Sequence, residues 1–214
     1  MFWIRFVNTF FKVTVWPFHY FVFGNKVYYE DKQAQSRRIK GSAILISNHT
    51  AVYDYGAFVF LFPTRTLRYQ MAEVLFEKQP LGTFLKWMGG IRIDRSAFDF
   101  SFLGESLRVL EQGGVLGVFP ESRLPLKDEE RPLPFKPSAA YIALESGAPI
   151  IPVYTEGRYF QWRRNHVIIG KPIDVRDYYD DSRPERDNLE AISRVLRQKI
   201  VELRDALEER TKAR

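Results

Sequence analysis

The feature of this sequence that most limits its fold is a regular alternation of short apolar runs and longer stretches with helical periodicity. The apolar runs have the length of strands and cover residues 43–47, 67–71, 91–93, 115–119 and 150–154. The helical stretches lie between them, at about residues 54–61, 80–88, 98–112 and 137–146. Neighbouring parallel strands need a crossover of this kind. The alternation therefore predicts an α/β fold with a mostly parallel central sheet and helices on both faces.

Two further strands and a long helix are expected outside this pattern. Residues 26–30 and 166–170 have strand character, and residues 183–214 carry apolar side chains spaced as on one side of a helix. With 214 residues, the chain is long enough for one domain with a buried sheet. We expect a single α/β domain over residues 25–214, preceded by a separate segment at residues 1–24.

This N-terminal segment is apolar and aromatic, and Pro17 is expected to interrupt any helix in it. Its longest uncharged stretch, residues 13–23, is shorter than the roughly 20 apolar residues that a transmembrane helix needs. Bulky residues at 20–23 are unlike a signal-peptide cleavage site. We therefore expect two short helices in the headgroup region of a bilayer, the alternative being a hydrophobic hairpin packed on the domain. The expected membrane contacts are Trp3, Arg5, Phe10, Phe11, Lys12, Trp16 and Phe18.

The net charge of +6 and the sequence pI near 9.5 favour an anionic partner. Because aromatic residues crowd into the first 23 residues, a phospholipid bilayer is favoured over nucleic acid. A second basic aromatic cluster, at residues 158–164, supports the alternative of a membrane-binding module without catalysis. Cysteine is absent, which excludes disulfides, thiolate catalysis and a Cys-based zinc site. We expect a peripheral protein on the cytoplasmic face of the membrane that does not bind nucleic acid.

A histidine and an aspartate follow the first buried strand, at His49 and Asp54. Five residues apart in a regular helix, they would point about 140° away from each other. They can meet only if His49 precedes the helix and Asp54 lies in its first turn. Asp54 could then fix the tautomer of His49 and leave the second ring nitrogen free as a general base for an alcohol. The alternative is that both residues only cap the start of a helix.

Two other strands end in charged residues. The strand at 91–93 carries Arg92, and Asp94 and Arg95 follow it. Period-two alternation turns Arg92 away from the isoleucines that flank it, towards a cleft where a guanidinium suits phosphate. A surface ion pair with Asp94 is the alternative. The strand at 115–119 is followed by Glu121, Ser122 and Arg123, which could hold a glycerol hydroxyl and a phosphate.

Four segments in this order resemble the sequence blocks of the glycerolipid acyltransferase family. Residues 48–54 match its Asn-His-x4-Asp block, residues 89–95 its second block, residues 119–121 the start of Phe-Pro-Glu-Gly-Thr-Arg, and residues 149–153 its proline block. The sequence departs from the third block, because Ser122 replaces the glycine and Arg123 occupies the place of the threonine.

The resemblance implies acyl transfer from acyl-CoA or acyl carrier protein to the sn-2 hydroxyl of lysophosphatidic acid, giving phosphatidic acid. His49 and Asp54 would form the catalytic dyad, without a metal or cofactor. The residues that would bind the substrate are Asn48, Arg92, Arg95, Glu121, Ser122, Arg123 and Lys136. The alternatives are another glycerol-phosphate or lysophospholipid acceptor, and a membrane-binding module without catalysis.

Overall fold

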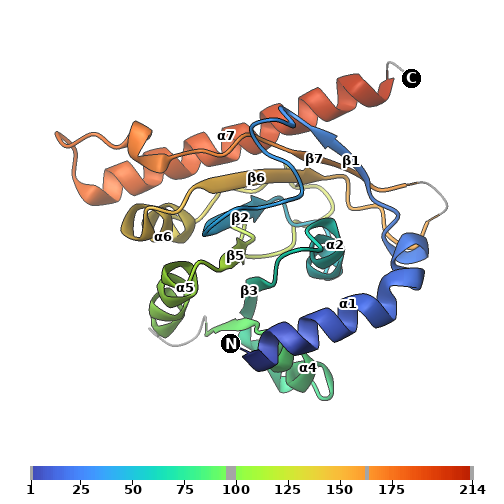
Figure 1. Ribbon diagram of the computed structural model, residues 1–214. Helices are drawn as coiled ribbons and strands as arrows, with labels where there is room; N and C mark the ends of the chain where they lie inside the picture. The colour runs from blue at the N-terminus through green and yellow to red at the C-terminus, as the bar shows by residue number, and fades with distance from the viewer. Residues whose placement is uncertain (1, 95–99, 162–163, 213–214) are drawn as a thin grey trace.

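The structure is a computed structural model that describes residues 2–94, 100–161 and 164–212 (Figure 1). Its strands are β1 (Lys26–Tyr29), β2 (Ala43–Ser47), β3 (Leu67–Ala72), β4 (Ile91–Ile93), β5 (Val115–Val118), β6 (Ile150–Thr155) and β7 (His166–Ile169). Its helices are α1 (Phe2–Val22), α2 (Asp54–Leu61), α3 (Glu73–Glu77), α4 (Leu81–Met88), α5 (Ser101–Glu111), α6 (Ser138–Ser146) and α7 (Glu185–Lys212), with a 3₁₀ turn, η1, at Val175–Tyr178.

The seven strands form one sheet in the order β1-β7-β6-β2-β5-β3-β4. The five strands from β6 to β4 run parallel to one another, whereas β7 is antiparallel to β6. The predicted α/β fold is therefore confirmed, including the two additional strands. Because β2, β5 and β6 are neighbours and parallel, their carboxyl ends meet at one edge of the sheet.

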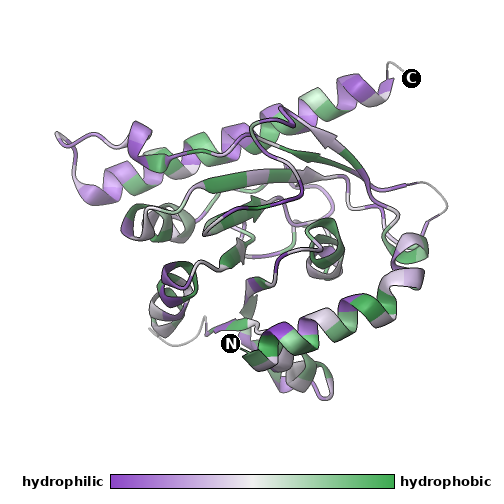
Figure 2. Cartoon of the chain, in the orientation of Figure 1, coloured by the Kyte–Doolittle hydropathy of each residue, from purple (hydrophilic) through white to green (hydrophobic). Residues whose placement is uncertain are grey.

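Both faces of the sheet are covered, and β2 shows how the sequence achieves this. All five of its residues are buried. Ile44 and Ile46 pack with α5, α6 and α7 on one face, while Leu45 packs with α2 and α4 on the other. Burial of each such side chain contributes about 1.5–3 kcal/mol. The predominantly apolar strands lie between the helices. The long helix α7 is mostly polar on its outer side, whereas α1 carries apolar residues along its length (Figure 2).

The long C-terminal helix α7 lies along the sheet at the level of β6 and β7 (Figure 1). Its buried apolar side chains recur every three or four residues, as the sequence predicted: Ile192, Leu196, Ile200, Leu203 and Leu207. This spacing places them on one side of the helix. At the margin of this buried side, Lys199 joins α7 to the residue after β1, because its Nζ lies 2.9 Å from Oε1 of Glu30.

The N-terminal segment forms one helix with Pro17 inside it, so the prediction of two short helices is wrong. Proline removes a single backbone donor, and His19 Nδ1 hydrogen-bonds the carbonyl oxygen of Trp16 beside the interruption. One side of α1 packs on α2 and α4. None of the described helices has enough consecutive apolar residues to cross a membrane.

Two of the expected membrane contacts lie on the packed side of α1. Lys12 is buried, and its Nζ donates to the carbonyl oxygens of Pro63 at 3.2 Å and Arg65 at 2.5 Å. Phe11 is half-buried against Phe60 and Phe84. The prediction that these two side chains face lipid is therefore wrong. They belong to the inner side of α1, which packs on the domain.

Candidate active site

The candidate site lies at the carboxyl ends of the central strands. His49 follows β2, Glu121 follows β5, and Thr155 is the last residue of β6. The chain turns sharply after β2, so that α2 begins at Asp54. This is the arrangement that the spacing of His49 and Asp54 required, with the histidine before the helix and the aspartate at its first residue.

His49 and Asp54 are in direct contact, as predicted. His49 Nδ1 lies 2.8 Å from Oδ2 of Asp54, and Asp54 is fully buried. A carboxylate at this distance accepts the proton of Nδ1, which leaves the lone pair on Nε2. The imidazole stacks on Phe119 with ring centroids 4.3 Å apart, and 21% of the His49 side chain is exposed. Packing thus fixes the ring while part of the side chain stays open to solvent.

Asp54 is held by four more hydrogen bonds. Its Oδ2 accepts from the backbone N–H of Thr50 at 2.6 Å and of Ala51 at 3.0 Å. Its Oδ1 accepts from the Thr50 hydroxyl at 2.7 Å and from the hydroxyl of Tyr159 at 2.5 Å. Bonds of this kind offset the cost of burying the polar carboxyl group.

Tyr159 was not predicted as a site residue. It lies in the loop after β6 and is only 7% exposed, although it belongs to the cluster at 158–164 that supports the alternative of a membrane-binding module. Burial, together with the nearby Asp54 carboxylate, raises the pKa of Tyr159 far above its ordinary value. The hydroxyl therefore remains a hydrogen-bond donor at every physiological pH. Within that cluster, Phe160 is exposed, and residues 162 and 163 lie outside the described residues.

Replacement of Tyr159 by phenylalanine removes one donor from Asp54 and leaves the ring in place. A hydrogen bond to a charged group contributes about 1.5–3 kcal/mol, so we expect the free energy of unfolding to fall by about that amount. We also expect kcat to fall severalfold, because the carboxylate that orients His49 becomes freer to move. Chemical denaturation and a pH profile of kcat measure the two effects. An unchanged kcat at every pH of the profile, together with lowered stability, would mean that Tyr159 acts on the fold alone.

Asn48 was expected to bind substrate, but its side chain is used within the fold. Its Nδ2 donates to the carbonyl oxygen of Thr155 at 2.9 Å, and its Oδ1 accepts from the Thr155 N–H at 3.0 Å. The residue is 6% exposed. The expectation is therefore corrected: Asn48 joins the ends of β2 and β6, which positions the turn that carries His49.

The side chain of Glu121 was also expected to bind substrate, and it too is used within the fold. Its Oε1 accepts from the backbone N–H of His49 and its Oε2 from that of Leu133, both at 2.7 Å. Burial raises the pKa of Glu121, and the two backbone donors counteract part of this rise. With both oxygens bonded and 4% of the residue exposed, Glu121 supports the loop that carries His49.

The two residues after Glu121 adopt a special loop conformation. Ser122 has a φ of 62°, in the left-handed region that favours the glycine of the family block. The guanidinium of Arg123 forms a bidentate pair with Glu129, with N–O distances of 2.7 and 2.6 Å. This pair raises the pKa of Arg123 and lowers that of Glu129 to about 2. The Arg123 group expected to bind phosphate is thus occupied by a carboxylate.

The remaining predicted substrate contacts are spread along the same edge. Arg92 lies on the edge strand β4, is 54% exposed on its side chain, and lies 3.6 Å from Asp94. Lys136 is exposed, and its backbone N–H donates to the Pro120 carbonyl oxygen. Arg95 lies outside the described residues. Among the predicted substrate and catalytic residues that the structure describes, only His49 and Asp54 form a side-chain hydrogen bond with each other.

This arrangement suits proton transfer from a hydroxyl. A fixed, partly exposed imidazole with a buried, multiply bonded carboxylate behind it has a defined tautomer and is suited to act as a general base. In the described part of the chain, no group of three or more His, Asp or Glu side chains is placed to hold a metal ion.

Comparison with known proteins gives consistent similarities. A model of the acyltransferase family matches residues 26–156. The 1-acyl-sn-glycerol-3-phosphate acyltransferase of Bacillus subtilis is 27% identical over 148 residues, which cover 67% of this chain and 71% of that protein. The protein of the same name from Limnanthes alba is 33% identical over 67% of this chain and 51% of its own length.

The fold also resembles a solved structure. The crystal structure of the 1-acyl-sn-glycerophosphate acyltransferase PlsC from Thermotoga maritima has a TM-score of 0.62 and 20% sequence identity. The similarity covers 94% of this chain and 79% of that one. At this identity, the match describes the shared fold.

Proposed function

The chain belongs to the acyltransferase family, and from this premise we propose that it transfers a fatty acyl group from a thioester to the sn-2 hydroxyl of lysophosphatidic acid. The observation that carries the proposal is the contact of 2.8 Å between His49 Nδ1 and Asp54, in a histidine whose side chain is 21% exposed. The names of the Bacillus and Limnanthes relatives support lysophosphatidic acid as the acceptor and phosphatidic acid as the product.

In the proposed reaction, His49 Nε2 takes the proton of the acceptor hydroxyl as its oxygen attacks the thioester carbonyl. The tetrahedral intermediate then expels the thiolate, which receives that proton from the imidazolium and leaves as a thiol. Asp54 stabilises the imidazolium between these two steps. General base catalysis of this kind contributes about 10²–10⁴-fold to the rate. The donor is acyl-CoA or acyl carrier protein.

The acceptor's phosphate is proposed to bind to cations at the same edge, namely Arg92, Arg123 and Lys136, with Arg95 as a fourth candidate. For Arg123, the phosphate must displace Glu129, because one guanidinium fork cannot make two bidentate pairs at the same time. Glu129 therefore acts as a competitor for the phosphate site.

Replacement of Glu129 by glutamine tests this competition. The neutral amide pairs weakly with Arg123, so we expect KM for lysophosphatidic acid to fall severalfold while kcat changes little. The measurement is initial rate against acceptor concentration, with Glu130→Gln as the matched control in the same loop. An unchanged or higher KM for Glu129→Gln would show that Arg123 does not bind the acceptor.

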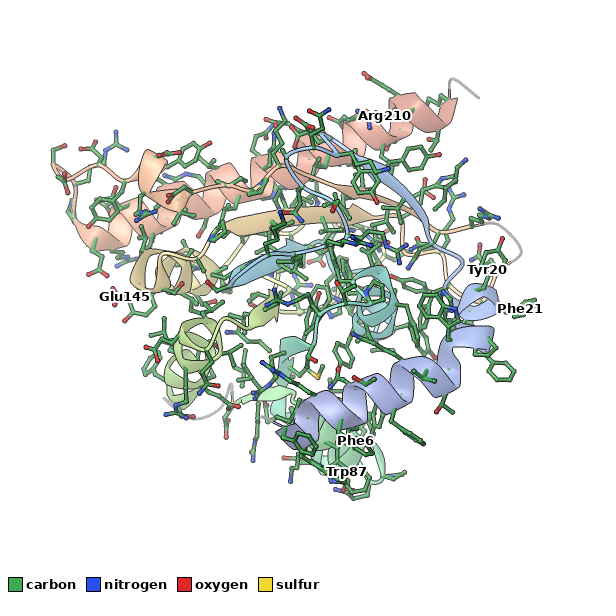
Figure 3. The ribbon with its side chains drawn as sticks, viewed as in Figure 1. Phe6, Tyr20, Phe21, Trp87, Glu145 and Arg210 are labelled. Atoms are coloured by element: carbon green, nitrogen blue, oxygen red, sulfur yellow. The ribbon has the colours of Figure 1, made fainter. Side chains whose placement is uncertain are left out.

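We further propose that residues 1–24 attach the enzyme to the cytoplasmic face of the membrane through the outer side of α1. Five of the seven predicted contacts are exposed there: Trp3, Arg5, Phe10, Trp16 and Phe18. Phe6 on α1 and Trp87 on the adjacent α4 extend this apolar surface, and Tyr20 and Phe21 lie at the other end of the helix (Figure 3). Exposed aromatic rings beside cations suit the headgroup region.

An assay of purified protein tests the proposed reaction directly. Lysophosphatidic acid, glycerol 3-phosphate and other lysophospholipids are each offered with acyl-CoA and with acyl carrier protein thioesters. We expect the highest kcat/KM for lysophosphatidic acid. A clear preference for another acceptor would replace the proposed substrate, and activity with none of them would remove the proposed catalytic role.

A further inference from the structure

A polar cavity lies at the edge of the sheet opposite to His49. Its volume is about 480 Å³, within the range of small-molecule sites. It is bounded by residues that directly precede strands, among them Thr66 before β3 and Gly114 before β5, and by Arg5 and Thr9 of α1. A strand of five residues spans about 16 Å, so this cavity is separate from the candidate active site.

Three arginines line this cavity. Arg68 is the one with an acidic partner, since its Nη2 lies 2.5 Å from Oε1 of Glu105. Arg65 donates to the carbonyl oxygens of Ile39 at 2.9 Å and Gly113 at 2.6 Å. Among the described residues, no carboxylate pairs with Arg65 or Arg5. Two guanidinium groups thus face one space without a compensating negative charge.

The surroundings of Arg65 increase this imbalance. Burial lowers the pKa of Arg65, and the positive charge of Arg5 lowers it further. The buried ammonium of Lys12 donates to the Arg65 carbonyl oxygen, which adds a third cation nearby without an acidic partner. Like charges around one space destabilise the free protein, and an anion bound between them would relieve the repulsion.

The lining also supplies the hydrogen-bond donors that a phosphate needs. Arg5 makes no hydrogen bond with the described residues, so its whole guanidinium is available, and Arg68 retains Nη1. Thr9, Thr64 and Thr66, which each carry a hydroxyl, are among the residues that line the same space. Guanidinium forks combined with hydroxyls match the oxygens of a phosphate better than those of a single carboxylate, which offers only two.

We propose that this cavity binds the phosphate group of an anionic ligand, with Arg5, Arg65 and Arg68 as its cationic contacts. The same chemistry fits a phospholipid headgroup and a soluble phosphate. A headgroup is favoured by position, because Arg5 and Thr9 lie on α1 beside the exposed Phe6 and Phe10. A bound phosphate would join α1 to the start of β3 and so hold the helix on the domain.

The first test uses inorganic phosphate and the full chain without substrate. Phosphate replaces chloride at constant ionic strength, and the thermal unfolding midpoint is recorded. We expect a rise of about 2–4 °C for the wild type and none for Arg5→Ala. The control is Lys86→Ala, which removes an exposed cation from the adjacent α4 but does not touch the cavity.

The second test distinguishes the two sources of phosphate by binding to phosphatidylglycerol and phosphatidylcholine vesicles. If a headgroup fills the cavity, Arg5→Ala loses more phosphatidylglycerol affinity than the about fivefold expected for one surface cation. If only the phosphate-induced shift is lost, a soluble phosphate is the ligand. Absence of the shift in the wild type, or equal behaviour of Arg5→Ala and Lys86→Ala in both assays, overturns the proposal. Neither assay depends on acyl transfer.

Discussion

Replacement of His49 by alanine is expected to lower kcat for acyl transfer by about 10²–10⁴-fold, the contribution of a positioned general base. The reason is geometric: His49 directly follows the central strand β2 and contacts Asp54, whereas the other described imidazole near this edge, His166, starts β7 beside the end of β6. His49 contacts Phe119 and Asp54 but is partly open to solvent. Release of free thiol from an acyl-CoA donor measures the effect.

A matched control for this variant is His166→Ala. His166 also has a carboxylate neighbour, because its Nδ1 lies 3.4 Å from Oε2 of Glu156, but it lies on β7. We expect His166→Ala to keep most of the activity and both variants to keep the circular dichroism spectrum of the wild type. Turnover by His49→Ala within a factor of two of the wild type would contradict the proposed base.

Replacement of Asp54 by asparagine is expected to lower kcat by at least about 10²-fold, the lower end of what loss of general base catalysis costs. The amide can keep its oxygen towards His49 Nδ1 and turn its NH₂ towards the hydroxyls of Thr50 and Tyr159, since hydroxyls can also accept. The tautomer of His49 is then retained, while the negative charge that stabilises the imidazolium is lost. We expect the free energy of unfolding to fall by about 2 kcal/mol.

The measurements for this variant are kcat at saturating acceptor and chemical denaturation. Asp174→Asn is the control, because it removes an aspartate charge from an exposed pair with Arg176 far from the site. Loss of stability without loss of kcat would mean that Asp54 only caps the start of α2, the alternative that the sequence left open.

Most strands and helices could be predicted because they depend on local patterns. β2 and β4 begin and end at the predicted residues, since a buried apolar run differs clearly from its flanks. The short helix α3 was missed, because five residues are too few to show helical periodicity. The continuity of α1 through Pro17 was also missed, because it depends on packing against α2 and α4.

The contacts of the candidate site also fall into local ones, which the sequence predicts, and long-range ones, which it does not. The contact of His49 with Asp54 could be predicted, because five residues of chain and a strand-to-helix turn determine it. The partners of Asn48 and Tyr159 could not, since each bond joins residues more than 100 positions apart. Sequence similarity indicates that such polar residues belong to a site, but which atoms they face is decided by tertiary packing.

The two ends of the described chain lie on opposite sides of the molecule, with α1 beside α4 and the last turns of α7 beyond the other face of the sheet (Figure 1). A biotin or fluorophore attached after Lys212 would therefore leave the aromatic side of α1 unobstructed. Molecules immobilised by that end on a sensor chip would present α1 to vesicles in the flow, whereas a tag before Phe2 would occupy the surface under study.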